Sequence, residues 1–474
     1  MSEVLKPDLC VIGAGSGGLS VAAAAASFGV DVVLIEKGKM GGDCLNYGCV
    51  PSKALIAAGR RAHQMRTAQE FGIISTNPSI NYAAVHRHVK GVIAAIEPND
   101  SVERFTGLGV KVIEAPARFV DKNTILAGDY EISARRVVIA TGSSPMVPPI
   151  PGLDTVSYFT NETIFENQSP LDHLIVIGGG PIGMELAQAH RRLGSRVTVV
   201  EAMKALGKDD KELTDILLKS LISEGIEIRE GARVEAVAAK GDLVTVRISE
   251  NGNESEIEGS HILVATGRKP NIDDLSLATA DIKHDHRGIK VSKGLKTSNK
   301  RVYAIGDVIG DLQFTHVANY HAGLVIRNAL FRMPVKVNND IIPWVTFTDP
   351  ELAHIGLAED EARKRHKDIN VLRWTYHEND RAQAEHATEG AVKVITRKNG
   401  QILGATIVGE HAGEIIQMWA LAITKKLKIG AMAGYVSPYP TFSEVNKRAA
   451  IVYYLPKLSN PFIQRVIGFL AKFG

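Results

Sequence analysis

Two of the three cysteines in the chain stand close together. Residues 41–53 read GGDCLNYGCVPSK, so Cys44 and Cys49 are separated by four residues and Lys53 follows shortly after. Pro51 is typical of the first turn of a helix, which predicts that a helix begins near Cys49. A helix N-terminus and a nearby ammonium group both favour a thiolate over a thiol. The segment therefore predicts a redox-active dithiol, against the alternative of two buried and inert cysteines.

A metal site is not expected. Zinc sites favour tighter cysteine pairs in sets of four ligands, and the chain has no second pair. Cys10 lies in the apolar run LCVIG, where a cysteine behaves as a small hydrophobic residue. Three cysteines in 474 residues also do not form a disulfide framework.

The chain contains an internal repeat around two glycine motifs. Residues 9–18 read LCVIGAGSGG and residues 174–183 read LIVIGGGPIG, each an apolar strand-like run that opens into G-x-G-x-x-G. Each copy is followed by a strand that ends in an acid, at the same interval from the first glycine (36 − 13 = 23 and 201 − 178 = 23). Such glycines let a pyrophosphate approach a helix N-terminus, and the acid accepts from ribose hydroxyls. The repeat predicts two dinucleotide sites rather than two structural turns, formed by Gly13, Gly15, Gly18 and Glu36 and by Gly178, Gly180, Gly183 and Glu201.

A second repeat supports this organisation. Residues 137–145 (VVIATGSSP) and 262–270 (ILVATGRKP) each place Ala-Thr-Gly at the end of a buried strand. Residues 303–308 (YAIGDV) place Asp307 at the carboxyl end of a strand, where ligands bind in open α/β sheets. From about residue 345 strands and helices alternate without nucleotide motifs, which predicts a separate C-terminal domain.

Length and composition limit the class of protein. A chain of 474 residues predicts about three domains. The 55 basic and 52 acidic residues nearly balance, which argues against nucleic-acid binding. No run reaches the ~18 apolar residues of a membrane span, and the N-terminus does not resemble a secretory signal. We therefore expect a soluble cytoplasmic protein.

The last residues form a distinct pattern. After Pro461, apolar residues recur at helical spacing, while Gln464, Arg465 and Lys472 fall outside the set, which comprises Phe462, Ile463, Val466, Ile467, Leu470 and Phe473. We expect an amphipathic helix that packs on a dimer. The alternative is a basic amphipathic helix on a membrane surface or on a partner protein.

With these motifs the chain resembles the pyridine nucleotide–disulfide oxidoreductases, which include dihydrolipoamide dehydrogenase, glutathione reductase and mercuric reductase. The resemblance extends from Asp8 to about Tyr454. It implies an α/β fold with two Rossmann-like dinucleotide-binding domains, for FAD and NAD, and a C-terminal α+β dimerisation domain. The boundaries expected are 1–150 for the first part of the FAD domain, 151–272 for the NAD(P) domain, 273–342 for the central part of the FAD domain, 343–455 for the dimerisation domain and 456–474 for the tail.

The resemblance also assigns roles to the residues around the cysteines. The first glycine motif holds FAD and the second holds the nicotinamide nucleotide. Glu201 favours NAD(H) over NADP(H), because an acid repels a 2′-phosphate. Cys44 is the cysteine that exchanges with substrate, and Cys49 forms a charge-transfer complex with the flavin. Lys53 lies near the flavin N5 and pairs with Glu185.

Further cofactor contacts follow from the same resemblance. Asp307 meets the FAD ribityl chain, and Ala117, in the turn APARF (115–119), gives a backbone contact. The remaining residues assigned to the cofactor sites are Thr141, Gly142, Gly267 and His316.

The acceptor depends on a segment that departs from the family pattern. The family carries His-Pro-Thr-x-x-Glu as an acid–base pair that acts across the subunit interface, and here Tyr439 stands for the His while Glu444 is kept. Mercuric reductases also have a Tyr at this place, but they carry a vicinal cysteine pair near the C-terminus, and this chain has no cysteine after Cys49. A phenol is a poor base at neutral pH. Tyr439 therefore replaces the acid–base residue or merely packs at the dimer interface.

We expect a homodimeric flavoenzyme of the dihydrolipoyl dehydrogenase type, which acts on a small disulfide or dithiol or on a lipoyl protein. One alternative is a mercuric reductase-like enzyme that reduces a metal ion or a quinone-type acceptor. Another is a redox-sensing flavoprotein with slow turnover.

Overall fold

The computed structural model describes residues 3–473. These residues fall into two compact units, of which unit 1 holds residues 3–68, 74–203 and 228–337 and unit 2 holds residues 69–73, 204–227 and 338–473. Both units combine strands and helices, which confirms the mixed α/β fold class.

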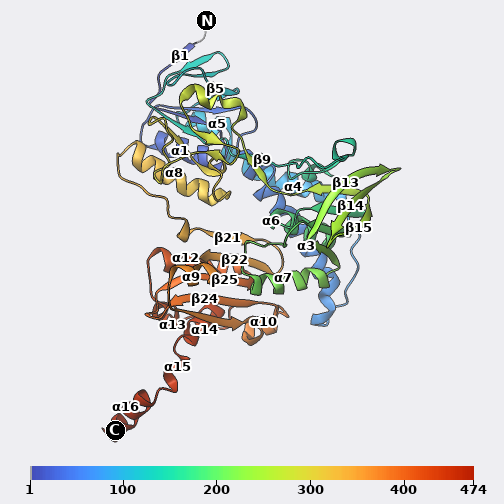
Figure 1. Ribbon diagram of the computed structural model, residues 1–474, viewed down its shortest axis with the longest axis vertical. Helices are drawn as coiled ribbons and strands as arrows, with labels where there is room; N and C mark the ends of the chain where they lie inside the picture. The colour runs from blue at the N-terminus through green and yellow to red at the C-terminus, as the bar shows by residue number, and fades with distance from the viewer. Residues whose placement is uncertain (1–2, 474) are drawn as a thin grey trace. The chain divides into compact units, whose positions relative to one another are not determined.

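A five-stranded parallel sheet forms the centre of the first nucleotide-binding fold. Its strand order is β20-β8-β2-β3-β4, with β2 (Leu9–Ile12), β3 (Val32–Glu36), β4 (Lys111–Glu114), β8 (Arg136–Ile139) and β20 (Val302–Ala304). Alternate side chains of a strand face opposite sides of a sheet. Leu9 and Val11 pack with α1 (Ser16–Ser27) and α8 (Thr315–Ala329) on one face (Figure 1). Cys10 and Ile12 pack on the other face, so both sides are covered, as a parallel sheet requires.

A second sheet covers the face that carries Cys10. Its strand order is β1-β7-β6-β5, with β1 (Glu3–Leu5), β5 (Ala117–Phe119), β6 (Ile125–Ala127) and β7 (Tyr130–Ile132). The segment APARF, expected as a turn, becomes strand β5 from Ala117 onward. The strand forms because Ala117 and Phe119 are buried while Arg118 between them is exposed, the alternation of a half-buried strand.

Four helices stand between β3 and β4 and carry the cysteine segment. They are α2 (Gly42–Asn46), α3 (Cys49–Thr67), α4 (Tyr82–Ile96) and α5 (Val102–Gly107). The helix predicted near Cys49 begins at that residue, with Pro51 in its first turn.

The second glycine motif repeats the arrangement of the first. The sheet order is β12-β11-β10-β16, with β10 (His173–Ile177), β11 (Arg196–Glu201), β12 (Ile226–Glu230) and β16 (His261–Val264), and α6 (Pro181–Arg192) follows β10. A three-stranded antiparallel sheet shares its core, formed by β13 (Ala232–Lys240), β14 (Leu243–Glu250) and β15 (Asn253–Gly259). The short strands β9 (Ser143–Pro145) and β17 (Arg268–Pro270), each just after an Ala-Thr-Gly motif, pair with each other. A last short pair is formed by β18 (His284–Asp285) and β19 (Gly288–Ile289).

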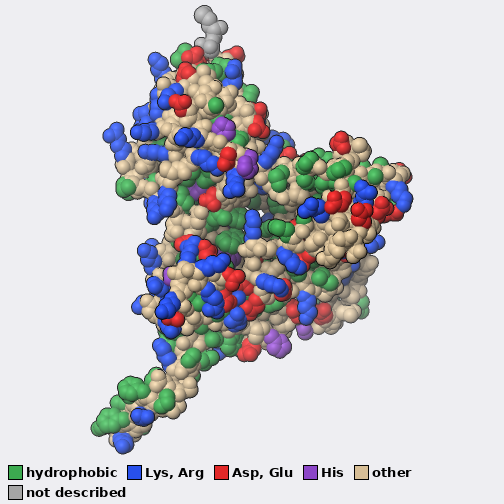
Figure 2. Space-filling model, in the orientation of Figure 1, with side chains coloured by type: hydrophobic (Ala, Val, Ile, Leu, Met, Phe, Trp, Pro, Cys, Tyr) green, Lys and Arg blue, Asp and Glu red, His purple; other side chains and the backbone are tan. Residues whose placement is uncertain are grey.

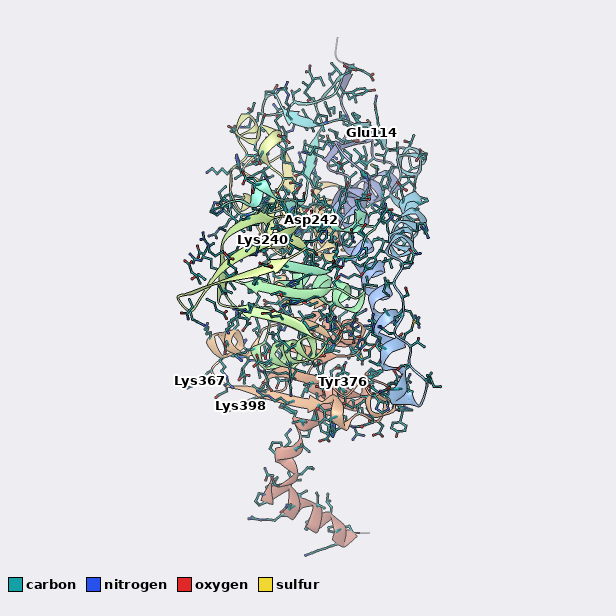
Figure 3. All side chains as sticks on the ribbon, turned by 90° about the vertical axis from the view of Figure 1, so that its right-hand side faces the viewer. Glu114, Lys240, Asp242, Lys367, Tyr376 and Lys398 are labelled. Carbon is teal, nitrogen blue, oxygen red and sulfur yellow. The ribbon has the colours of Figure 1, made fainter. Side chains whose placement is uncertain are left out.

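Unit 2 is built on a five-stranded antiparallel sheet. Its order is β21-β22-β25-β24-β23, with β21 (Pro343–Thr346), β22 (Glu351–Gly356), β23 (Ile369–Thr375), β24 (Ala391–Arg397) and β25 (Ile402–Gly409). Trp419 and Tyr376, the latter labelled in Figure 3, are fully buried in its core. The helices of this unit are α7 (Lys211–Ser223), α9 (Glu359–Arg365), α10 (Asp380–Ala384), α11 (Ala412–Ile415), α12 (Gln417–Thr424), α13 (Ile429–Gly434), α14 (Glu444–Val452), α15 (Leu455–Leu458) and α16 (Pro461–Leu470).

Candidate functional site

The first glycine turn, between β2 and α1, leaves no room for side chains at two of its glycines. Gly13 has a φ of +102°, and a Cβ there would lie 2.5 Å from the Ala140 carbonyl oxygen. A Cβ on Gly18 would lie 1.8 Å from the Gly13 carbonyl oxygen. Gly15 differs, because a Cβ on it would meet no atom closer than 4.0 Å. Gly15 caps α1 without a side-chain hydrogen bond, so the helix N-terminus faces open space that suits a phosphate.

The second glycine turn, between β10 and α6, has the same construction. A Cβ on Gly178 would lie 2.4 Å from the Ala265 carbonyl oxygen, and one on Gly183 would lie 2.0 Å from the Gly178 carbonyl oxygen. A Cβ on Gly180 would meet nothing within 4 Å, and this residue caps α6 without a side-chain bond. The two glycine turns therefore have the same local geometry as well as the same residue spacing.

The two acids at the strand ends are held in matching positions. Glu36 Oε2 accepts from the Ala14 amide at 2.6 Å, and Glu201 Oε2 accepts from the Gly179 amide at 2.7 Å. The other oxygen of each carboxylate accepts from the amide two residues further along, at 2.8 Å in both copies. Each carboxylate thus stands beside its glycine turn, where ribose hydroxyls can donate to its remaining lone pairs. Open glycines, uncapped helices and fixed acids together fit two dinucleotides.

Asp307 belongs to a network that reaches the cysteine segment. It lies in the turn Gly306–Ile309 directly after β20, and its Oδ2 accepts from Ser143 Oγ at 2.6 Å. Ser143 Oγ in turn accepts from Arg268 Nε at 2.7 Å, and Arg268 Nη2 lies 3.0 Å from Asp43 Oδ1. Burial raises the pKa of Asp307. The network connects the turn that carries Asp307 with the residue before Cys44.

The other residues assigned to the cofactor sites lie in unit 1. Ala117 is the buried first residue of β5. Thr141 Oγ1 donates to a main-chain carbonyl at 2.7 Å, and Gly142 and Gly267 have φ values of +69° and +139°. His316, in the first turn of α8, stacks on an adjacent phenylalanine ring with centroids 5.3 Å apart. Contact of these residues with a cofactor stays a prediction.

The two cysteines meet as a hydrogen-bonded pair of thiols. Cys44 is half-buried in α2, and Cys49 is the first residue of α3. The hydrogen bond from the Cys44 thiol, a second one from Thr315 Oγ1 at 3.3 Å and the charge of Lys53 lower the pKa of Cys49 to about 6, although burial acts against them. The bond with Cys49, then burial, raises the pKa of Cys44 far above its usual value. The pair therefore keeps its proton on Cys44 and its charge on Cys49.

Lys53 forms the ion pair that the resemblance implies. Its Nζ lies 2.8 Å from Glu185 Oε2, and the Glu185 side chain is only 8% exposed. The pair connects α3 with α6, which pack closely because Gly59 faces the backbone of α6 at Ala189. The helix of the second glycine motif thus fixes the cation beside Cys49.

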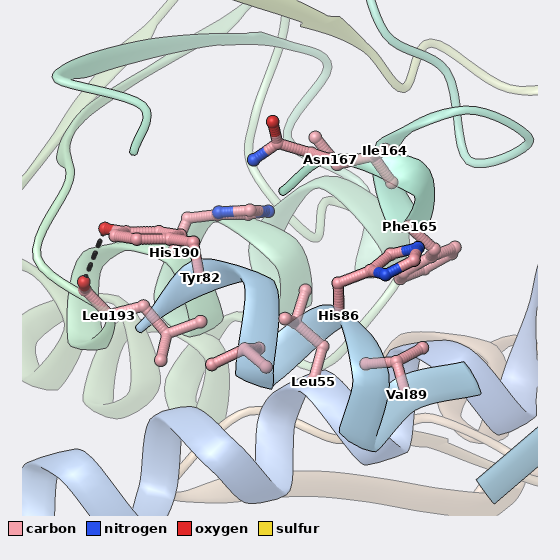
Figure 4. A pocket seen from close by; sticks show the side chains of 10 residues that line it. Leu55, Tyr82, His86, Val89, Ile164, Phe165, Asn167, His190 and Leu193 are labelled. Atoms are coloured by element: carbon pink, nitrogen blue, oxygen red, sulfur yellow. Dashed lines mark hydrogen bonds between the residues drawn. The ribbon is translucent and has the colours of Figure 1, made fainter. Parts of the chain in front are cut away.

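A small, mainly apolar pocket lies beside the same helices (Figure 4). Residues of α3, α4, α6 and the segment around Ile164–Glu166 line it, and Tyr82 Oη donates to the Leu193 carbonyl oxygen at 2.7 Å. His190 is buried in its wall, and within residues 3–473 neither ring nitrogen has a hydrogen-bond partner. Burial, then the charge of His261, lowers the pKa of His190 to about 4. His190 is therefore neutral at neutral pH and adds no charge to α6.

The C-terminal segment holds Tyr439 and Glu444 in separate interactions within unit 2. Tyr439 is 70% exposed, and its hydroxyl donates to Asp380 Oδ2 at 2.7 Å. That hydrogen bond, then the Asp380 charge, raises the pKa of Tyr439. Glu444 begins α14 and pairs with Arg448 one turn later at 2.8 Å. The phenol therefore keeps its proton, and the acid is engaged by a cation.

Three residues at the site were missed by the sequence reasoning. Thr315 precedes the assigned His316, Arg268 follows the assigned Gly267, and Asp43 precedes Cys44. Their adjacency to assigned residues was the available signal. Their partners lie far away in the sequence, so no sequence signal indicated the contacts themselves.

The fold and the site define a protein with two dinucleotide-binding folds and a pair of redox-capable thiols. The chain belongs to the pyridine nucleotide-disulphide oxidoreductase family, whose model matches residues 7–322, while the model of the family's dimerisation domain matches residues 342–450. The resemblance found in the sequence is thereby confirmed. The chain is an NAD(P)H-dependent flavoprotein disulfide oxidoreductase with a C-terminal dimerisation domain.

Its relatives carry the names of different activities. Mercuric reductase of Bacillus cereus is 35% identical over 449 residues, which cover 94% of this chain and 71% of the relative. Dihydrolipoyl dehydrogenase of Geobacillus stearothermophilus is 35% identical over 462 residues, which cover 94% and 96%. Among solved structures, the Cu(II) complex of the HOCl-induced flavoprotein disulfide reductase RclA from Escherichia coli matches with a TM-score of 0.84 at 26% identity, over 94% of this chain and 99% of that chain. The chain is equally similar to proteins with two different activities. The electron acceptor must therefore be inferred from the residues of the site.

Proposed function

We propose that the protein is a cytoplasmic homodimer that passes electrons from NADH to the Cys44–Cys49 pair, and from the resulting dithiol to an acceptor. The observation that carries this proposal is the polarised thiol pair, with the proton on Cys44 and the charge on Cys49. FAD, when bound, supplies the two-electron relay between nicotinamide and disulfide. We assign FAD to the first glycine turn with Glu36 and Asp307, and NAD(H) to the second turn with Glu201. A chain of 474 residues with three cysteines has no disulfide framework, which suits a reducing compartment.

The residues around the pair have complementary roles in this proposal. Lys53 lies close enough to lower the pKa of Cys49, and Glu185 holds the ammonium group in place. Thr315 donates a further hydrogen bond to the thiolate. Cys44, which keeps its proton, is the cysteine that we assign to the acceptor, and Cys49 is the one that we assign to the flavin.

We further propose that the acceptor is a thiophilic metal ion rather than a dithiol or disulfide of the lipoyl type. Turnover of dihydrolipoamide needs a base that removes a thiol proton, and general-base help is worth about 10²–10⁴-fold. The Tyr439 hydroxyl keeps its proton and donates a hydrogen bond to Asp380, and Glu444 is paired with Arg448, so neither is poised as a base. Reduction of a metal ion needs no such base. The relatives named mercuric reductase and dihydrolipoyl dehydrogenase are equally similar to this chain, so the choice rests on the contacts of Tyr439 and Glu444.

The proposed reaction balances. A sulfur–sulfur bond forms between Cys44 and Cys49; the pair gives two electrons to the metal ion and releases the proton of Cys44 to solvent. One Hg(II) ion takes both electrons, or two Cu(II) ions take one each.

An anaerobic acceptor screen tests the proposal. The purified FAD-loaded protein is given NADH with Hg(II), Cu(II), lipoamide, glutathione disulfide or a quinone, and kcat/KM is measured for each. We expect the highest value with a metal ion, and its loss in the double variant Cys44→Ser/Cys49→Ser, while NADH still bleaches the flavin. A higher value with lipoamide would return the protein to the dihydrolipoyl dehydrogenase type. Equal metal reduction by the double variant would show that the thiols are not on the path.

A further inference from the structure

The C-terminal helix α16 presents an apolar face that nothing in residues 3–473 covers. Its side chains Phe462, Val466, Ile467, Phe469 and Leu470, with Phe473 just beyond the helix, are between 39% and 74% exposed. Figure 1 shows α16 standing apart from the sheet of its own unit, and Figure 2 shows hydrophobic side chains gathered on it. Contiguous exposed apolar surface of this kind marks an interaction site.

The helix is formed by its own sequence signals. Asn460 caps it, with Oδ1 accepting from the Phe462 amide at 2.9 Å, and Pro461 occupies the first turn. At 100° per residue, the apolar side chains fall on one side of the helix, while Gln464, Arg465 and Lys472 fall on the other. The helix is therefore amphipathic.

Charge decides which partner fits this face. Glu444 is the last acidic residue in the sequence, and basic residues follow it at Lys447, Arg448, Lys457, Arg465 and Lys472. Lys457 also lies over the rings of Tyr453 and Tyr454, with its Nζ 5.2 and 4.9 Å from their centroids. Two copies of the tail would bring like charges together. A negatively charged surface complements them.

The length of the helix decides how it would meet a bilayer. Ten residues extend about 15 Å, roughly half of the ~30 Å hydrocarbon core. None of the helices formed by residues 3–473 is long and apolar enough to cross a membrane. A short amphipathic helix with a basic polar side lies in the plane of the interface instead.

We propose that residues 461–473 form a membrane-surface anchor, in which the apolar face of α16 enters the headgroup region of an anionic bilayer while Arg465 and Lys472 contact its phosphates. This anchor would hold the reductase at a membrane surface whatever its acceptor. It rests on exposure and charge in unit 2 and not on the chemistry of the cysteines.

Vesicle co-sedimentation of the full-length flavoprotein tests the anchor. The probes are phosphatidylcholine vesicles with and without phosphatidylglycerol, at low and high salt. We expect binding to the anionic vesicles, weakened by salt, since each Lys or Arg near such a surface contributes about fivefold to partitioning. The variant Arg465→Gln/Lys472→Gln should lose about 25-fold in binding to anionic vesicles. The variant Phe462→Ser/Phe469→Ser should lose about tenfold or more, because two aromatic side chains no longer enter the interface.

A matched control and a second measurement separate the outcomes. Gln464→Ser places the same new residue on the polar side and should leave binding unchanged. Flavin content and mass in solution, from light scattering, report on folding and assembly. Wild-type protein that stays in the supernatant with both kinds of vesicle overturns the proposal. A fall in mass from dimer to monomer in Phe462→Ser/Phe469→Ser, with vesicle binding unchanged, would also overturn it and assign the face to a second copy of the chain.

Discussion

Replacing Cys44 by alanine should raise the pKa of Cys49, whereas replacing it by serine should leave that pKa at about 6. The hydrogen bond from the Cys44 thiol is the largest of the interactions that lower the pKa of Cys49 from 9.0 to about 6. Serine keeps an O–H donor at this place and alanine has none, while neither can form a disulfide with Cys49. The two variants therefore separate the hydrogen bond from the redox chemistry.

The expected shift follows from the strength of such a bond. A hydrogen bond to a charged group contributes about 1.5–3 kcal/mol, and about 1.4 kcal/mol corresponds to one pKa unit, so its loss raises the pKa by about 1–2 units. At pH 7 a pKa of about 6 gives about 90% thiolate, whereas a pKa of about 7–8 gives about 50–10%. Thr315 and Lys53 still favour the thiolate, so the pKa should not return to 9.0.

The assay is a pH titration of the long-wavelength absorption that a thiolate gives beside oxidised flavin. A lowered pKa means that the thiolate is present above the midpoint and is lost as the pH falls through it. We expect a midpoint near 6 for Cys44→Ser and about one unit or more higher for Cys44→Ala. Flavin content serves as the folding control. Equal midpoints in the two variants, or a lower one in Cys44→Ala, would refute the reasoning.

Three further predictions concern other residues of the site. Thr315→Val should also raise the midpoint of that titration, because its hydroxyl lies 3.3 Å from the sulfur of Cys49; an unchanged midpoint would contradict the bond. The kcat/KM for NADH should exceed that for NADPH, because the Glu201 carboxylate repels a 2′-phosphate, and Glu201→Ala should reduce the ratio of the two values. A higher kcat/KM for NADPH in the wild type would show that Glu201 does not select between the nucleotides. Tyr439→Phe should leave metal-ion reduction within about twofold, and Tyr439→His should raise dihydrolipoamide oxidation toward the 10²–10⁴-fold that a base supplies; a large loss in Tyr439→Phe would give the hydroxyl a chemical role.

The nucleotide-binding folds could be predicted because their constraints are local. Gly18 has no room for a Cβ, because the carbonyl oxygen of Gly13 in the same turn excludes it. The acids Glu36 and Glu201 then contact amides of the glycine turns 22 residues earlier, an interval that the βαβ unit fixes. Two equal spacings in one chain were therefore sufficient evidence.

The surroundings of Tyr439 could not be predicted in the same way. Its partner Asp380 lies 59 residues earlier, at the start of α10, and no spacing rule connects the two. The bond from Thr315 to Cys49 spans 266 residues. Such contacts depend on how helices and loops pack, and a pattern of residue types does not encode them.

The second repeat, by contrast, does more than mark two strand ends. Because β9 and β17 follow the two Ala-Thr-Gly motifs and pair with each other, Ser143 and Arg268 are brought together. The guanidinium of Arg268, whose side chain is only 10% exposed, is then held 3.0 Å from Asp43 and 3.9 Å from Asp307. The negative charge of Asp43 acts against a thiolate at Cys49, so the cation held on that carboxylate reduces this opposition and favours the charge on Cys49. The repeated Ala-Thr-Gly motifs therefore do more than end two strands. They also bring together Ser143 and Arg268, and Arg268 connects Asp307 with Asp43 beside the cysteines.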